Sequence, residues 1–156
     1  MECYARVSSY FDYPTDEPAE SDPTFLADRG EQDWAIVLAH TETRRFSAGE
    51  EVIRAGDDDR ALYLLTAGSL AVASGAAFRT IDAPSVVGEV AFLDGGKRSL
   101  TLVATSDGEL RRLGLDSFEA LAGRHPELAR AMLFDLGRIV SLRLRFLTEL
   151  IEDGVS

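Results

Sequence analysis

The chain has 156 residues, enough for one domain with a hydrophobic core, and 46% hydrophobic with 28% charged residues is typical of globular proteins. Its formal net charge of −11 repels nucleic-acid phosphates, so direct DNA binding is not expected without a local basic patch. Cys3 is the only cysteine, which excludes an intramolecular disulfide and favours a reducing compartment. Because the sequence has no secretion signal and no membrane-spanning apolar run, we expect a cytoplasmic protein that does not contact a membrane.

Residues 1–30 are predicted to be an acidic N-terminal extension. Seven acidic residues stand against two arginines in this segment, and three prolines interrupt regular structure. Five aromatic residues argue against a fully disordered tail. Two interpretations stay open: a tail held to the domain by these rings, or an arm that docks a partner or inhibits the domain.

Residues 31–152 are predicted to form the domain itself. A short helix is expected over 31–40, because Trp34, Val37 and Leu38 recur at helical spacing. Short β-prone runs punctuated by glycines follow, at 43–46, 51–54, 61–66, 69–73, 78–81, 100–104 and 109–115. The pattern predicts a mainly β fold with flanking helices, in which the strands form a sandwich or a barrel-like roll.

The segment 87–101 carries the clearest signal for a binding site. Gly88 lets the backbone approach a ligand closely, and the short apolar run after it is long enough for about one helical turn, whose first N–H groups suit an anion. Arg98 offers a planar charged fork for two phosphate oxygens, and Ser99 adds a hydroxyl. Glu89 would repel a phosphate but can accept a hydrogen bond from a sugar hydroxyl. These residues predict a ribose at Glu89 and a phosphate at Arg98.

Other charged residues give weaker signals. The three consecutive acids at 57–59 lack the alternating spacing of a calcium loop, so an exposed acidic turn is predicted there. The pair at 111–112 is predicted to be two solvated arginines on a strand. The two histidines, His40 and His125, lie outside the strands, so no metal site and no catalytic set is expected.

Two helices are predicted to end the chain. Asp116 and Ser117 are candidate N-caps of the first, which runs through Leu121 and is closed by Gly123. Pro126 suits the first position of the second.

This second helix, predicted over 127–152, is apolar around more of its circumference than a single core-facing stripe requires. One face, predicted to cover the β-domain, comprises Leu133, Leu136, Val140 and Leu144. The face left over comprises Leu128, Met132, Ile139, Phe146 and Leu150. An identical helix in a symmetric homodimer is the economical explanation for the second face, and a covering segment from the extension is the alternative.

Taken in order, these features resemble the cyclic nucleotide-binding domain of the catabolite activator proteins, the cyclic nucleotide-dependent kinase regulatory subunits and the cyclic nucleotide-gated channels. The resemblance covers about residues 31–150. It is carried by Phe46, Gly49, Val52, Ile53, Gly56 and Asp57, then by Leu62–Leu65, Gly68, Leu70 and Val72, and finally by Gly88–Ala91 with Arg98 and Ser99. It implies a β-roll of the jelly-roll kind with a long C-terminal helix and a phosphate-binding cassette, the name used below for residues 87–101.

The resemblance also implies the roles of individual residues. Glu89 is expected to hold the ribose 2′-hydroxyl and Arg98 the cyclic phosphate, with backbone contacts from Gly88, Val90 and Ala91. The implied ligand is cAMP, with cGMP as the second candidate. No cofactor is expected. The preference for cAMP rests on analogy with bacterial activators and on the absence of a threonine after the arginine.

Ser99 matches the hydroxyl-bearing position of bacterial activator-type members. Leu142, Arg143 and Phe146 on the final helix are the candidate lid over the purine. Leu100 stands where a small alanine is common, which predicts different packing beneath the phosphate. Activator-type members continue into a helix-turn-helix, whereas this sequence ends at Ser156, so direct DNA binding is not expected.

Three classes of function follow from the sequence. A cyclic nucleotide sensor is favoured, signalling by rearrangement of the cassette and the C-terminal helix, through a homodimer or an unidentified effector protein. The alternative is a nucleotide-free dimerising or scaffolding domain of the same fold, against which Glu89 and Arg98 count. A metal-dependent β-barrel enzyme is rejected, because its clustered imidazole ligands are absent from the sequence.

Overall fold

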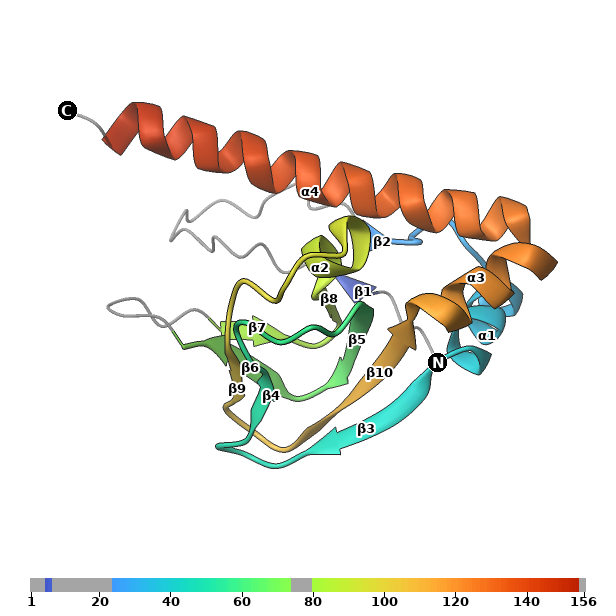
Figure 1. The fold of residues 1–156 in the computed structure, drawn as a ribbon, viewed down its shortest axis with the longest axis horizontal. Coiled ribbons are helices and arrows are strands. Elements are labelled where there is room, and N and C mark those ends of the chain that lie inside the picture. The colour runs from blue at the N-terminus through green and yellow to red at the C-terminus, as the bar shows by residue number, and fades with distance from the viewer. Residues whose placement is uncertain (1–4, 7–23, 74–79, 155–156) are drawn as a thin grey trace.

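The structure, a computed structural model, describes residues 5–6, 24–73 and 80–154 (Figure 1). Most of the predicted acidic extension, including Cys3, and the first two residues of the strand predicted at 78–81 lie outside the described residues. Within α4, no side chain is described at 146, 147, 149–151, 153 or 154.

Two antiparallel four-stranded sheets form a β-roll, which confirms the fold class predicted from the glycine-punctuated runs. One sheet has the order β3 (Glu42–Phe46), β10 (Gly108–Gly114), β5 (Ala61–Ala67) and β8 (Ser85–Val87). The other has the order β4 (Glu51–Ile53), β9 (Leu102–Ala104), β6 (Ser69–Val72) and β7 (Thr80–Asp82). A separate two-stranded ladder joins β1 (Ala5–Arg6) to β2 (Thr24–Phe25). The runs predicted from the sequence do not include β8, whose three residues are all buried and therefore do not alternate between polar and apolar environments.

In the described part of the chain, four helices flank the roll, namely α1 (Glu31–Ala39), α2 (Glu89–Asp94), α3 (Leu115–Arg124) and α4 (Pro126–Gly154). Figure 1 shows α4 lying across one side of the molecule, over α2 in the cassette and over α1 and α3 near its beginning. The prediction that α3 runs through Leu121 and is closed by Gly123 is wrong, because the helix continues to Arg124 and has His125 as its C-cap. Its N-cap is Gly114 rather than Asp116 or Ser117.

Strand β5 separates two hydrophobic cores. Leu62 and Leu64 pack toward the helices, whereas Tyr63 and Leu65 pack between the two sheets, as the alternation of side chains along a strand requires. Because both faces are buried, the strand has an almost unbroken apolar sequence.

The face of α4 that covers the roll agrees with the prediction at Leu136, which is fully buried, and differs from it at other positions. Leu128, Met132 and Ile139 were assigned to the outer face, yet all three are buried in the core. Leu133 and Leu144 were assigned to the core, yet they are 42% and 62% exposed. Helical spacing defined both stripes, but it could not show which one the β5 side of the molecule would bury.

The end of the predicted extension contributes to the core. Phe25 and Leu26 are fully buried among the helices, and Phe25 lies edge-on to Trp34 of α1. The backbone N–H of Leu26 donates to the carboxylate of Asp135 on α4 at 2.8 Å. These contacts tie the chain before α1 to the long helix.

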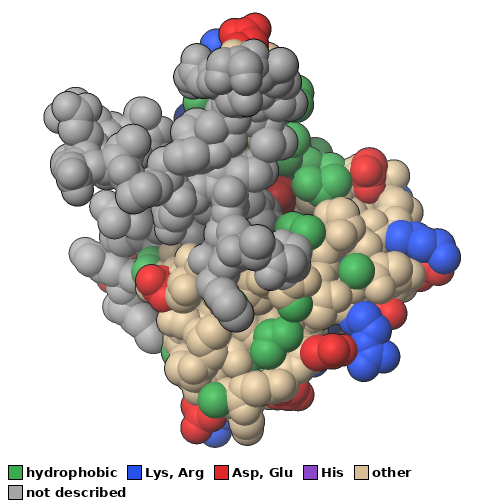
Figure 2. Space-filling view, turned by 90° about the vertical axis from the view of Figure 1, so that its left-hand side faces the viewer, with side chains coloured by type: hydrophobic (Ala, Val, Ile, Leu, Met, Phe, Trp, Pro, Cys, Tyr) green, Lys and Arg blue, Asp and Glu red, His purple; other side chains and the backbone are tan. Residues whose placement is uncertain are grey.

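Figure 2 shows the molecule from the side where α4 ends. On the described part of this face, hydrophobic side chains lie down the middle and charged side chains of both signs lie mostly toward the rim.

Candidate functional site

The cassette begins where β8 passes into α2 at Gly88. This residue has φ +78°, in the left-handed region that favours glycine, and it precedes the first turn of α2. A Cβ at this position would collide with Nη1 of Arg98 and would lie 3.3 Å from the carbonyl oxygen of Ala61. Gly88 is therefore needed both for its backbone conformation and for the close approach of the arginine.

The predicted site residues surround one cavity of about 310 Å³ between the cassette and α4. This volume lies within the usual range of small-molecule sites. All six predicted binding residues line it, namely Gly88, Glu89, Val90, Ala91, Arg98 and Ser99. The other lining residues are Ile53, Leu100, Leu102, Val140, Arg143 and Leu144.

Arg98 is almost fully buried, with 5% of its surface exposed. Its Nη1 donates to the carbonyl oxygen of Gly88 at 2.9 Å, and its Nη2 donates to that of Ala61 at 2.7 Å. Its guanidinium carbon also lies 5.3 Å from the centre of the Tyr63 ring, within the range of a cation–π contact. These contacts fix the guanidinium at the wall of the cavity.

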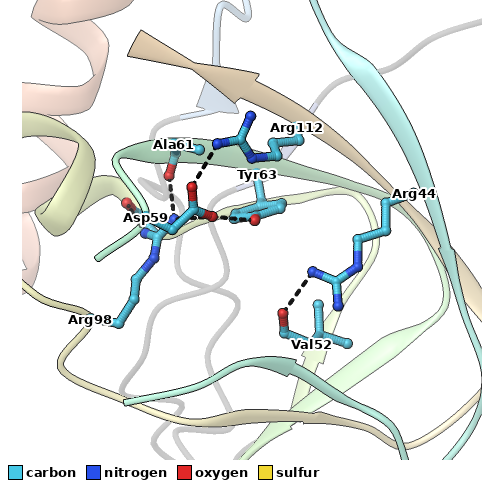
Figure 3. A network of polar contacts seen from close by, with 8 residues as sticks. Arg44, Val52, Asp59, Ala61, Tyr63, Arg98 and Arg112 are labelled. Atoms are coloured by element: carbon cyan, nitrogen blue, oxygen red, sulfur yellow. Dashed lines mark hydrogen bonds and ion pairs between the residues drawn. The ribbon is translucent and has the colours of Figure 1, made fainter. Parts of the chain in front are cut away.

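Asp59 in the β4–β5 loop compensates the buried charge of Arg98 (Figure 3). Its Oδ2 lies 3.5 Å from Nη2 of Arg98 and accepts a hydrogen bond from the Tyr63 hydroxyl at 2.5 Å, while its Oδ1 accepts one from Arg112 at 2.6 Å. The two arginines approach this carboxylate from different sides in Figure 3. The prediction that Arg112 is a solvated strand residue is therefore wrong, because Asp59 holds it.

The protonation of this network follows from its contacts. Burial alone would raise the pKa of the Asp59 carboxyl, but hydrogen bonds from Arg112 and Tyr63, with the charge of Arg98, outweigh burial and leave that pKa below its usual value. Burial and the adjacent Asp59 carboxylate raise the pKa of the Tyr63 hydroxyl. At neutral pH the carboxylate therefore accepts and the hydroxyl donates.

Glu89 lies at the other end of the cassette and is 1% exposed. It forms an ion pair with Nη1 of Arg143, which projects from α4 and is itself 8% exposed. Since both side chains line the cavity, this pair connects the long helix directly to the proposed ribose acceptor.

The structure separates the three candidate lid residues. Arg143 lines the cavity, whereas Leu142 is 40% exposed and is not among the lining residues. The side chain of Phe146 lies outside the described part of the structure. Val140 and Leu144, which precede and follow Arg143 on the same helix, line the cavity instead of Leu142.

The sequence also missed residues that support the site from outside the cassette. Asp59 and Tyr63 are four residues apart, but Arg112 lies 53 residues from Asp59, so no local spacing connects all three. Leu100, which departs from the common alanine, lines the cavity and packs against the core between the sheets.

The described residues contain neither a metal-binding cluster nor a membrane-crossing helix. No group of three or more His, Cys, Asp or Glu residues in that part of the chain is placed to hold a metal ion. None of the helices described there combines the length and apolar character needed to cross a membrane.

Comparison with known proteins identifies the family to which the chain belongs. The model of the cyclic nucleotide-binding domain matches residues 43–125, more than half of the chain. The chain belongs to this family. The matched part includes the β-roll from β3 to β10, the whole cassette and α3.

The chain is similar in sequence to several curated proteins. The Cyclic AMP receptor protein of Thermus thermophilus is 30% identical over 121 residues, which cover 70% of this chain and 52% of that protein. A cAMP-dependent protein kinase regulatory subunit of Hypocrea atroviridis is 32% identical over 83 residues, covering 53% of this chain and 18% of that protein. Glutaminase 2 of Bradyrhizobium diazoefficiens is 31% identical over 121 residues, covering 76% of this chain and 19% of the enzyme. The chain thus spans between about a fifth and about a half of these curated relatives.

Solved structures share the fold. A cyclic nucleotide-binding domain from Methylobacillus flagellatus KT superposes with a TM-score of 0.73 at 20% identity, covering 84% of this chain and 77% of the other. The Thermus thermophilus Catabolite Activator Protein gives a TM-score of 0.65 at 25% identity, covering 85% and 72%.

Proposed function

We propose that the domain is a sensor for a cyclic purine nucleotide, with cAMP preferred over cGMP. The observation that carries the proposal is the placement of Glu89, Arg98, Ser99 and the Gly88–Ala91 backbone around a single cavity. A ribose hydroxyl would donate to Glu89, and a cyclic phosphate would accept from Arg98 and Ser99. The N–H groups of Val90 and Ala91 belong to the first turn of α2, where N–H groups have no intrahelical acceptor.

The preference for cAMP has support from named relatives. The Thermus thermophilus and Hypocrea atroviridis proteins are both named for cAMP and are 30% and 32% identical to this chain over the matched regions. Residue 99 is a serine rather than a threonine, which also favours cAMP by analogy with bacterial activators.

The proposed signal passes through Arg143. In the structure this arginine binds Glu89, the carboxylate that a ribose hydroxyl would also approach. A bound ligand therefore changes what α4 contacts at the cassette, and it shifts the population of α4 positions by its different affinity for each. Val140 and Leu144 would cover the ligand from the same helix.

Titration with cAMP and with cGMP, followed by calorimetry and thermal melting, tests this function. A ligand at 100 times its Kd adds about 2.7 kcal/mol to the free energy of unfolding. For a domain of this size, that corresponds to a rise in melting temperature of roughly 5–10 °C. Neither heat nor a thermal shift with either nucleotide at millimolar concentration would overturn the proposal.

The Arg98→Ala variant tests the site. It removes the only arginine among the residues of the cassette, and the thermal shift with cAMP is expected to disappear. Arg98→Lys keeps a positive charge without the planar fork and should restore part of the shift. Arg45→Ala is the matched control, because the Arg45 side chain is 85% exposed on β3. An undiminished shift in Arg98→Ala would show that the ligand binds elsewhere.

A homodimer through α4 is the second part of the proposal. Leu133, Gly137, Val140, Leu144, Leu147 and Ile151 recur at alternating spacings of four and three, which is the heptad pattern of a coiled-coil seam. Leu133 and Leu144 are exposed in the monomer, as a seam between two copies requires. Light scattering should give a dimer mass for the wild type and a monomer mass for Leu133→Asp with Leu144→Asp. Arg145→Asp, one residue outside the seam, should stay dimeric.

A nucleotide-free scaffold of the same fold is the second candidate function. It is favoured by one observation, namely that Glu89 and Arg98 already have partners within the chain. A dimer mass together with no calorimetric heat from either nucleotide would support it.

A further inference from the structure

The C-terminal end of α2 is held by a residue outside the cassette. Helix α2 has only six residues, too few to be stable alone, so its position depends on tertiary contacts. The last carbonyl groups of any helix have no intrahelical donor. Here Nε of Arg60 donates to the carbonyl oxygen of Phe92 at 3.0 Å, and Nη2 donates to that of Leu93 at 3.1 Å.

The guanidinium of Arg60 also lies close to Gly95, the glycine that ends α2. A Cβ on Gly95, whose φ is +73°, would lie 3.3 Å from both Cζ and Nη1 of Arg60. A positive charge near the C-terminal end of a helix also interacts favourably with the negative end of the helix dipole. Charge, hydrogen bonding and shape therefore all fit Arg60 to this end of α2.

Arg60 acts from a fixed point in the roll. It immediately precedes β5, and its own carbonyl oxygen accepts a hydrogen bond from the backbone N–H of Leu115 at 3.1 Å, in the first turn of α3. The preceding residue, Asp59, binds Arg98 and Arg112. The loop that carries Asp59 and Arg60 therefore contacts the C-terminal end of α2 and Arg98 near the end of the cassette. It also contacts the first residue of α3.

We propose that Arg60 is a positioning residue for the ligand site, acting through α2 and without contact to the ligand. It keeps Glu89, Val90 and Ala91 at the cavity wall by fixing the opposite end of the short helix that carries them. This inference rests on the proposed nucleotide function for its effect on affinity, but the hold on α2 exists without any ligand.

The first experiment uses ligand-free protein and measures amide hydrogen exchange by NMR. The N–H groups of Phe92 and Gly95 bond to Gly88 and Ala91 within α2, so their exchange reports the integrity of this helix. In Arg60→Ala their exchange is expected to be about tenfold faster, because two hydrogen bonds from a charged donor are lost. Arg54→Ala is the matched control, since Arg54 lies in the same loop and pairs with Glu51 at 2.9 Å. Unchanged exchange in Arg60→Ala would overturn the proposal, whatever the ligand is.

The second experiment measures cAMP affinity by calorimetry on the full chain. Arg60→Ala is expected to weaken binding by about tenfold, equivalent to about 1.4 kcal/mol. Arg60→Lys should recover part of this loss, because an ammonium group at the helix end restores the charge but not both bonds of the fork. The melting temperature of the ligand-free variant is expected to fall by about 3 °C at most, so a general loss of folding would not account for the weaker binding.

The two experiments separate the possible failures. Faster exchange with unchanged cAMP affinity would overturn the positioning role. If the wild type binds neither cAMP nor cGMP, the proposed function fails, and the exchange measurement still decides whether Arg60 holds α2.

Discussion

The cassette has an acid–arginine pair at each end, and the two pairs differ in the origin of the second partner. At one end, Glu89 of the cassette binds Arg143 from α4. At the other end, Arg98 of the cassette lies beside Asp59 from the β4–β5 loop. One partner thus comes from a long helix outside the roll, and the other comes from a loop between two strands of the roll.

The other contacts of the two pairs also differ in whether they come from the roll or from α4. Arg98 is also fixed by the carbonyl groups of Gly88 and Ala61, and its backbone N–H donates to the carbonyl of Asp57 at 2.9 Å. Glu89, by contrast, is paired with a residue of α4, which lies outside the two sheets. The roll therefore supplies the partners that fix the proposed phosphate end, while α4 supplies the charged partner at the proposed ribose end.

Among the variants that test this difference between the two ends of the cassette, removal of Arg143 should have the largest effect on stability. Truncating one member of a buried ion pair costs about 3 kcal/mol of unfolding free energy, because the remaining charge stays buried. For Arg143→Ala this corresponds to a fall in melting temperature of roughly 6–12 °C. Calorimetric melting of the ligand-free protein measures it, with Arg145→Ala as the control from the exposed side of the same helix.

The double variant Glu89→Leu with Arg143→Leu separates stability from binding. It removes both charges, so most of the lost stability should return, while nucleotide binding should not. If Arg143→Ala melts like the wild type, the pair of Glu89 and Arg143 does not hold α4 to the cassette. The two ends of the cassette would then not differ as described above.

Gly88→Ala should have the next largest effect, and it acts at the phosphate end. A non-glycine residue at φ +78° costs about 1–2 kcal/mol in backbone strain, and the new methyl group would displace the Arg98 side chain. We expect a moderate fall in melting temperature together with loss of the nucleotide-induced shift. Gly49→Ala is the matched control, because Gly49 also has positive φ, at +90°, but a Cβ there meets nothing within 4 Å. Equal ligand binding by both variants would contradict the role of Gly88 in placing Arg98.

The part of the site that could be predicted from the sequence is the part that is local. Residues 88–99 lie within one short segment, so glycine, acid and arginine at fixed spacing indicated a cavity wall before any fold was known. The two-sided burial of β5 was equally visible, as a run of apolar residues between glycine turns. The resemblance to the cyclic nucleotide-binding family, which the family model confirms, rested on the same local features.

What could not be predicted depends on contacts between distant segments. Asp59 and Arg112 are 53 residues apart and meet only because β5 and β10 pair in the sheet. On α4, Met132 and Leu133 are adjacent apolar residues, yet one is fully buried and the other is 42% exposed. Spacing along one helix does not determine which stripe the rest of the chain covers, so the prediction is right for Leu136 and wrong for its neighbour Leu133.

The smallest expected effect concerns the pH dependence of the Asp59 network at the phosphate end. The pKa of Asp59 is lowered in the folded state, so its contribution to stability is present above the unfolded pKa of about 4 and is lost as the pH falls through the folded value. The pKa of Tyr63 is raised, so its contribution is present below the unfolded pKa of about 10 and is lost as the pH rises through the folded value.

The variants Asp59→Asn and Tyr63→Phe test how the contributions of these two residues to stability change with pH. The wild type should exceed Asp59→Asn in unfolding free energy by about 1 kcal/mol at pH 7, a modest figure because the carboxylate is partly exposed to solvent. That difference should shrink when denaturant unfolding is repeated below pH 4, where the unfolded chain takes up a proton at Asp59 at a higher pH than the folded protein does. The difference from Tyr63→Phe should instead shrink above pH 10. Differences that stay constant from pH 3 to pH 11 would show that the Asp59 carboxylate does not compensate the charge of Arg98, and the phosphate end would then depend on the two carbonyl groups alone.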